Sequence, residues 1–90
     1  MTPENAEKKA IKEYLSLIGC FNFPLLAGLG AVPGLPDRFA VWRGRVYAIE
    51  IKAPGGKQSD KQKIFQDNWE AQGQTYVLGG IDEVMKIIKR

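Results

Sequence analysis

The sequence contains no histidine and one cysteine, and no apolar run approaches the roughly 18 residues of a membrane-spanning helix. Without imidazole, a histidine-based catalytic triad, a histidine general base and histidine-ligated zinc sites are excluded. Cys20 cannot form an internal disulfide and is predicted to be a core thiol. The polar start at residues 1–5 lacks the features of a secretory signal. We therefore expect a cytoplasmic protein, without a membrane partner, whose chemistry uses carboxylates, lysines and oxygen-binding metals.

Length and charge indicate the number of domains but give little information about the function. Ninety residues suit a single domain, residues 1–90, with a modest hydrophobic core. Thirteen basic and ten acidic residues give a net charge of +3. This slight excess permits a polyanionic partner such as a nucleic acid but does not establish one.

Cap residues and apolar spacing predict three helices. The first begins at Thr2 and Pro3 and ends near residue 18, the second runs from a cap at Ser59 to about residue 72, and the third is capped by Asp82. Their expected apolar positions are Ile11, Leu15 and Ile18; Phe65 and Trp69; and Ile81, Val84, Met85 and Ile88.

Strands are predicted over 21–26, 38–42, 45–52 and 75–78, where β-branched and aromatic residues gather. The element order is then α-β-β-β-α-β-α, an α/β fold. Glycines and prolines break regular structure after the first strand, so the segment from Phe23 to Gly34 is interpreted as a flap over DNA or a dimer contact. Trp42, at the hairpin tip, is expected to be an exposed aromatic.

The turn at Arg43-Gly44 sets the register of the hairpin between the second and third strands. If Trp42 pairs with Arg45, the numbers of paired residues sum to 87, and Asp37 then faces Glu50 across the ladder. A three-residue loop would instead send the two carboxylates to opposite faces. The predicted site therefore depends on this turn.

Glu50 and Lys52 interrupt an otherwise apolar strand and lie on the same face of it. One interpretation is a solvated Glu–Lys pair at a sheet edge. The other adds Asp37, because two adjacent carboxylates favour a bound cation. Asp37, Glu50 and the backbone carbonyl of Ile51 would form part of a Mg²⁺ shell. Lys52 could then orient or deprotonate the attacking water and stabilise charge on a scissile phosphate.

These residues resemble the PD-(D/E)XK nuclease superfamily, with Pro36-Asp37 followed by Glu50-Ile51-Lys52. The longer pattern is similar to the VRR-NUC family. It comprises Gly34-Leu-Pro-Asp37, a hairpin, Glu50-Ile-Lys-Ala-Pro-Gly-Gly56, Gln62 in the next helix and a Gly73-Gln-Thr-Tyr-Val strand, and it spans nearly the whole chain.

The resemblance implies a restriction-endonuclease-like core, with a central mixed sheet flanked by helices. It also implies DNA cleavage dependent on Mg²⁺ or Mn²⁺. Stand-alone viral, phage-type members of the family act as homodimers on branched DNA such as four-way (Holliday) junctions. A homodimer also follows from chemistry, because one metal site cuts one strand and a C2 dimer would make two symmetric incisions.

The family pattern adds two site residues that also have ordinary explanations. Glu4 on the first helix, with Glu7 in reserve, would complete the metal site, although an acid in a first turn also complements the helix dipole. Gln62 matches a catalytic-site glutamine of the family, but Ser59-x-x-Gln62 is also a capping box.

A basic rim for phosphates is predicted around the hairpin and the following loop; its residues are Arg38, Arg43, Arg45, Lys57 and Lys61. Any one of them could equally be a solvated surface charge. A non-catalytic nucleic-acid-binding module, a subunit that only assembles with other proteins, and a general rather than junction-selective nuclease remain alternatives. Joint retention of Asp37, Glu50 and Lys52 favours an enzyme.

Overall fold

Three helices and four strands follow one another in the predicted order. The computed structural model describes residues 1–26 and 32–90. Its elements are α1 (Pro3–Leu17), β1 (Phe21–Pro24), β2 (Arg38–Trp42), β3 (Arg45–Ile51), α2 (Asp60–Ala71), β4 (Thr75–Gly79) and α3 (Ile81–Ile87). The predicted order α-β-β-β-α-β-α is confirmed, with element ends within two residues of expectation. Part of the predicted flap or dimer contact, residues 27–31, lies outside the described residues.

Local capping explains where α1 and α2 begin. The Thr2 hydroxyl accepts the Asn5 N–H at 3.2 Å, with proline at the first helical position. At α2, the Ser59 hydroxyl accepts the Gln62 N–H while the Gln62 side chain accepts the Ser59 N–H, which is a complete capping box.

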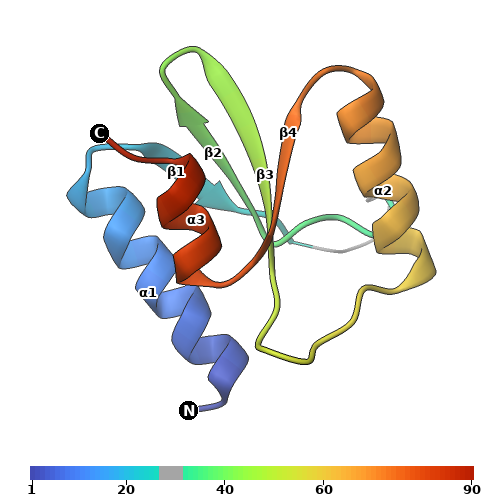
Figure 1. Ribbon diagram of the computed structural model, residues 1–90, viewed down its shortest axis with the longest axis horizontal. Coiled ribbons are helices and arrows are strands. Elements are labelled where there is room, and N and C mark those ends of the chain that lie inside the picture. The colour runs from blue at the N-terminus through green and yellow to red at the C-terminus, as the bar shows by residue number, and fades with distance from the viewer. Residues whose placement is uncertain (27–31) are drawn as a thin grey trace.

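The four strands form one mixed sheet in the order β1-β2-β3-β4 (Figure 1). β2 pairs antiparallel with both β1 and β3, whereas β3 and β4 are parallel. A parallel neighbour requires a crossover connection, and α2 provides it. Because β3 lies between β2 and β4, it is an inner strand, and the interpretation of Glu50 and Lys52 as a pair at a sheet edge is wrong.

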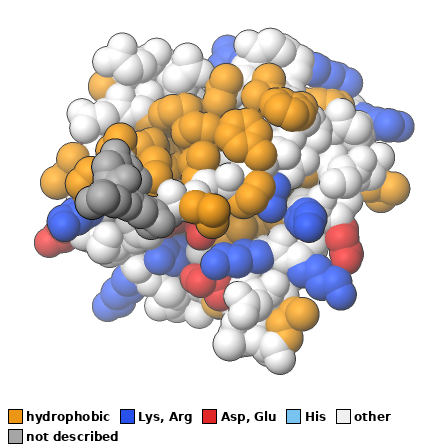
Figure 2. Space-filling model, turned by 180° about the vertical axis from the view of Figure 1, so that it is seen from behind, with side chains coloured by type: hydrophobic (Ala, Val, Ile, Leu, Met, Phe, Trp, Pro, Cys, Tyr) orange, Lys and Arg blue, Asp and Glu red, His pale blue; other side chains and the backbone are white. Residues whose placement is uncertain are grey.

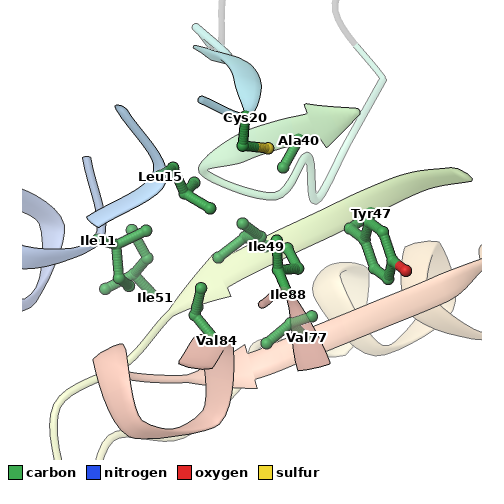
Figure 3. Packing of buried hydrophobic residues seen from close by; sticks show 10 residues of the cluster. All are labelled: Ile11, Leu15, Cys20, Ala40, Tyr47, Ile49, Ile51, Val77, Val84 and Ile88. Carbon is green, nitrogen blue, oxygen red and sulfur yellow. The ribbon is translucent and has the colours of Figure 1, made fainter. Parts of the chain in front are cut away.

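Helices cover the two faces of the sheet unequally. Figure 1 shows α1 and α3 side by side on one face and α2 on the other. The core lies beneath α1 and α3 (Figure 3), and it is formed by Ile11, Leu15, Cys20, Ala40, Tyr47, Ile49, Ile51, Val77, Val84 and Ile88. Cys20 is free and buried, as predicted. No helix in the described segments has the length and apolarity needed to cross a membrane.

Strand alternation separates core from site. Tyr47, Ile49 and Ile51 on β3 join the core under α1 and α3. The side chains between them, Ala48 and Glu50, therefore point to the face that α2 covers. Unlike α1, α2 contains no fully buried residue. The two faces are thus built differently, one apolar and closed, the other carrying a buried charge.

The C-terminal helix and the hairpin tip differ from expectation. The cap residue of α3 is Gly80, not Asp82, because the side chains of Glu83 and Glu7 accept the first N–H groups. Val84 is buried in α3, whereas Met85 is exposed, so the inward face of the helix is rotated from the predicted stripe.

Trp42 is packed against the core instead of being exposed. Its indole N–H donates to the Lys89 carbonyl at 3.2 Å. The chain after α3 thus covers a residue that is near the tip of the hairpin, a contact that local sequence does not reveal.

Gly34 brings the segment before β2 against the start of α2. Its φ is +76°, and a Cβ at this position would overlap the backbone of Lys61. Gly55 has a similar φ of +83°, but a Cβ built there would have no atom of the described residues within 4 Å. Gly34 precedes Asp37 by three residues, so its close approach to α2 also restricts the position of Asp37.

Gly34→Ala should therefore destabilise the protein more than Gly55→Ala. Both variants place a side chain at positive φ, but only the first creates a clash, which adds about 1–3 kcal/mol. Urea denaturation of the two variants measures the difference. Equal free energies of unfolding would show that α2 moves away at no cost.

Candidate active site

Glu50 is the one charged residue of the described chain that is fully buried, with 0% of its surface exposed. Its Oε1 accepts two hydrogen bonds, from the Tyr76 hydroxyl at 2.5 Å and from Gln58 Nε2 at 2.9 Å. Its Oε2 accepts none from the described residues, although Lys52 Nζ lies 3.6 Å away. A buried carboxylate oxygen without a hydrogen-bond donor is costly unless a cation compensates it.

Tyr76 is held as a hydrogen-bond donor by its surroundings. Burial raises the pKa of its hydroxyl, and so do the hydrogen bond to Glu50 and the negative charges of Glu50 and Asp37. The neutral hydroxyl therefore persists at any pH near neutrality. It donates a hydrogen bond to the ionised carboxylate of Glu50.

Asp37 is hydrogen-bonded to the backbone of the two residues that flank Glu50 in sequence, Ile49 and Ile51. Its N–H donates to the Ile49 carbonyl at 2.9 Å, and its Oδ2 accepts the Ile51 N–H at 2.6 Å. The predicted register is confirmed for five pairs, from Trp42↔Arg45 to Arg38↔Ile49. The ladder ends there, one step before Asp37 and Glu50, so Asp37 reaches β3 through its carboxylate as well as its backbone.

Each carboxylate thus has one anchored oxygen and one oxygen that faces a lysine. Asp37 Oδ1 lies 3.8 Å from Lys8 Nζ, just as Glu50 Oε2 lies 3.6 Å from Lys52 Nζ. Lys8 also lies 3.7 Å from Glu4 Oε2. The two negative charges of the carboxylates are matched by the two positive charges of the lysines, which lowers the electrostatic repulsion between the two acids.

The first-helix acids are placed differently from each other. Glu4 is linked to Asp37 only through Lys8, whereas Glu7 accepts the Ile81 N–H at 2.6 Å and so stabilises the start of α3. Within residues 1–26 and 32–90, no three acidic or cysteine side chains gather closely enough to hold a metal. The ligand role of Glu4 therefore stays a prediction.

The glutamine that contacts Glu50 is Gln58, which the sequence analysis missed. Gln58 Nε2 also donates to Gln66 Oε1 at 2.8 Å, which ties the loop before α2 to the helix itself. Gln62 forms the capping box instead, so that interpretation of its side chain is confirmed, and a catalytic role for it stays a prediction. The signal for Gln58 is tertiary, since it depends on how the loop folds back over β3.

The residues of the predicted basic rim lie in three separate places. Arg43 and Arg45 lie at the hairpin tip, and β3 carries the chain about 17 Å from there to Glu50. Lys57 and Lys61 flank the start of α2 and are exposed. Arg38 lies next to Asp37, and its guanidinium donates to Asn22 Oδ1 at 2.6 Å. Burial lowers the pKa of Arg38.

A small cavity opens beside Asp37. Its volume is about 200 Å³, and its lining residues include Lys8, Arg38, Asp37 and Ile51. Two cations and one of the site carboxylates therefore border the same space. A phosphate group at its mouth would meet both positive charges.

Aromatic side chains connect the site to the surface. Tyr76 contacts Phe65, Phe65 stacks on Trp69, and the contacts continue through Phe39 to Phe23 and Phe21. Phe21 is 68% exposed on β1. Hydrophobic side chains gather broadly on one face of the molecule (Figure 2). Exposed apolar surface of this kind is typical of an interaction site.

The donor set fits a hard divalent cation. Two carboxylates each present a free oxygen, and one of these, Glu50 Oε2, is buried without a hydrogen bond. The Ile51 N–H points toward Asp37, and the carbonyl of a strand residue points to the same side as its N–H. Mg²⁺ and Mn²⁺ prefer this combination of carboxylate and carbonyl oxygens.

Comparison with known proteins agrees with the fold. No protein-family model and no curated protein matches the sequence. A solved structure described as "VRR_NUC domain" superposes with a TM-score of 0.83 and 22% sequence identity, covering 97% of this chain and 98% of the other. The chain therefore has the fold of a VRR_NUC domain, and the predicted α/β core with a mixed sheet flanked by helices is confirmed.

The buried Tyr76 hydroxyl makes stability depend on pH in the alkaline range. Its pKa in the fold is raised above the unfolded value of about 10, so the associated stability is complete below about pH 10 and is lost as the pH rises further. Urea denaturation as a function of pH should show a steeper alkaline loss for wild type than for Tyr76→Phe. Parallel curves for the two proteins would contradict this prediction.

Proposed function

We propose that this chain is a VRR-NUC nuclease domain that hydrolyses phosphodiester bonds in DNA with Mg²⁺ or Mn²⁺. The observation that carries the proposal is the buried Oε2 of Glu50, which has no hydrogen bond within the described residues and lies 3.6 Å from Lys52 Nζ, while the carboxylate of Asp37 is anchored on the N–H of the next residue, Ile51. The VRR_NUC fold supports the same conclusion. A purely structural ion pair would give no reason to gather a second acid at this point.

The proposed ligands are Asp37 Oδ1, Glu50 Oε2 and the Ile51 carbonyl, with Glu4 as a further candidate. A bound divalent cation would polarise the scissile phosphate and make the attacking water more acidic. The chain's own residues would supply the orientation. Asp37 is fixed by the Ile51 N–H, and Glu50 is fixed by Tyr76 and Gln58.

Lys52 is the proposed catalytic cation. Its ammonium group already lies 3.6 Å from Glu50 Oε2, and 21% of its side chain is exposed, so it can reach a substrate. There it would orient the attacking water and stabilise the negative charge that develops on the phosphate. Lys8 and Arg38, which line the neighbouring cavity, would hold an adjacent phosphate. A catalytic contribution of Gln62 is part of the same proposal.

Asp37→Asn, Glu50→Gln and Lys52→Ala should each lower the rate of DNA cleavage by at least about 10²-fold. The neutral variants of the acids remove charge while keeping shape, and EDTA should abolish wild-type cleavage. The measurement is cleavage of labelled four-way junction, duplex and single-stranded DNA with Mg²⁺ or Mn²⁺.

Glu70→Gln and Lys63→Ala are matched controls, since both residues are exposed on α2. They should cleave as wild type does. If the protein cleaves none of these substrates in the presence of metal, the proposed nuclease activity is wrong and a non-catalytic DNA-binding module is favoured. Equal cleavage by all variants would indicate a contaminating nuclease.

We further propose that the protein acts as a homodimer on branched DNA, within the cytoplasm of its cell. A single site can cut one strand, and two-fold symmetry would place a second site on the opposite strand. Phe21 and Phe23 are exposed aromatic residues, and they support the proposal that this part of the molecule contacts a second protomer. The free edge of β1 does not favour strand pairing, because Pro24 has no N–H to donate.

Light scattering should give a mass near twice the 10.0 kDa of the chain. A cruciform-bearing supercoiled plasmid should be converted to linear product without accumulating nicked circles, because paired sites cut both strands in one encounter. Junction cleavage should exceed linear-duplex cleavage by roughly tenfold or more. A monomeric mass with nicked product would contradict the dimer, and equal rates on both substrates would indicate a general nuclease.

A further inference from the structure

We infer that Tyr76 is a positioning residue that, together with Gln58, holds the carboxylate of Glu50 in the orientation that leaves one oxygen facing a divalent cation. The inference rests on the proposed function and adds two residues to it. Neither residue belongs to the Asp37, Glu50 and Lys52 pattern. Each acts through Glu50 without touching substrate.

The geometry of the carboxylate is strongly asymmetric. Both neutral donors, the Tyr76 hydroxyl and the Gln58 amide, reach the same oxygen, Oε1, at 2.5 and 2.9 Å. The other oxygen, Oε2, is also buried but has no hydrogen-bond donor among residues 1–26 and 32–90. Buried polar atoms usually have a hydrogen-bond partner, whereas Oε2 has, within the same residues, only the Lys52 ammonium group at 3.6 Å as a compensating charge.

This asymmetry has a direct physical consequence. The terminal torsion of a glutamate side chain is broad, so rotation could turn the carboxylate away from the orientation seen here at little cost. Two hydrogen bonds to Oε1 oppose that rotation and keep Oε2 directed toward Lys52 and the free side of the site. A ligand oxygen held in place before the cation arrives loses less conformational freedom on binding.

The two donors come from opposite sides of the crossover. Tyr76 is on β4, which lies parallel to β3, and Gln58 is in the loop before α2. Gln58 is itself held by Gln66 on α2. The orientation of Glu50 therefore depends on the loop, the helix and the strand being docked together.

The test is the affinity of DNA-free protein for Mn²⁺, measured by electron paramagnetic resonance. Tyr76→Phe removes only the hydroxyl, and it should weaken Mn²⁺ binding by about 10–100-fold, the usual effect of losing a group that orients a metal ligand. Raising the Mn²⁺ concentration should restore most of the cleavage rate. Gln58→Met removes the other donor from a half-buried loop position and should weaken binding in the same direction.

Tyr47→Phe is the matched control, because Tyr47 is also buried, on β3, but belongs to the core on the opposite face. It should bind Mn²⁺ as wild type does. Equal Mn²⁺ affinity of wild type, Tyr76→Phe and Gln58→Met, with only stability changed, would overturn the inference and leave the proposed function intact. Absence of Mn²⁺ binding by folded wild type would overturn the proposed function and the inference with it.

Discussion

The buried charge of Glu50 is the constraint on which the rest of this structure depends. A carboxylate removed from water in the middle of a sheet costs several kcal/mol unless hydrogen bonds and opposite charges compensate it. The compensation comes from three separate parts of the chain, namely the end of β3 with Lys52, the loop before α2 with Gln58, and β4 with Tyr76. The polar site is consequently as dependent on tertiary structure as the hydrophobic core is.

The crossover from β3 through α2 to β4 is what brings these parts together. Because α2 contains no fully buried residue, aromatic contacts and specific hydrogen bonds must hold it to the sheet. Phe65 and Trp69 contact Tyr76 and Phe39, and the Trp69 indole N–H donates to the Thr75 carbonyl at 2.8 Å. Docking of α2 and orientation of Glu50 are therefore linked through Tyr76, which belongs to both sets of contacts.

Local sequence predicted the parts of this arrangement that local physics controls. A two-residue turn at Arg43-Gly44 determines the hairpin register, and the register puts Asp37 next to Glu50 once the chain leaves β2. Helix starts at Thr2 and Ser59 are likewise local. The start of α3 is not local, because the Ile81 N–H is accepted by Glu7 on α1, which is distant in sequence.

The residues around Glu50 could not be found in this way. Tyr76 becomes its partner only through the parallel register of β3 and β4, in which Ala48 is opposite Tyr76 and Glu50 is opposite Leu78. That register depends on how α2 packs, not on a turn. Gln58 similarly competes with Gln62, and only the folded loop distinguishes the glutamine that caps a helix from the one that reaches the carboxylate. A short motif thus identifies the charged groups of a site, whereas their orientation is a property of the whole crossover.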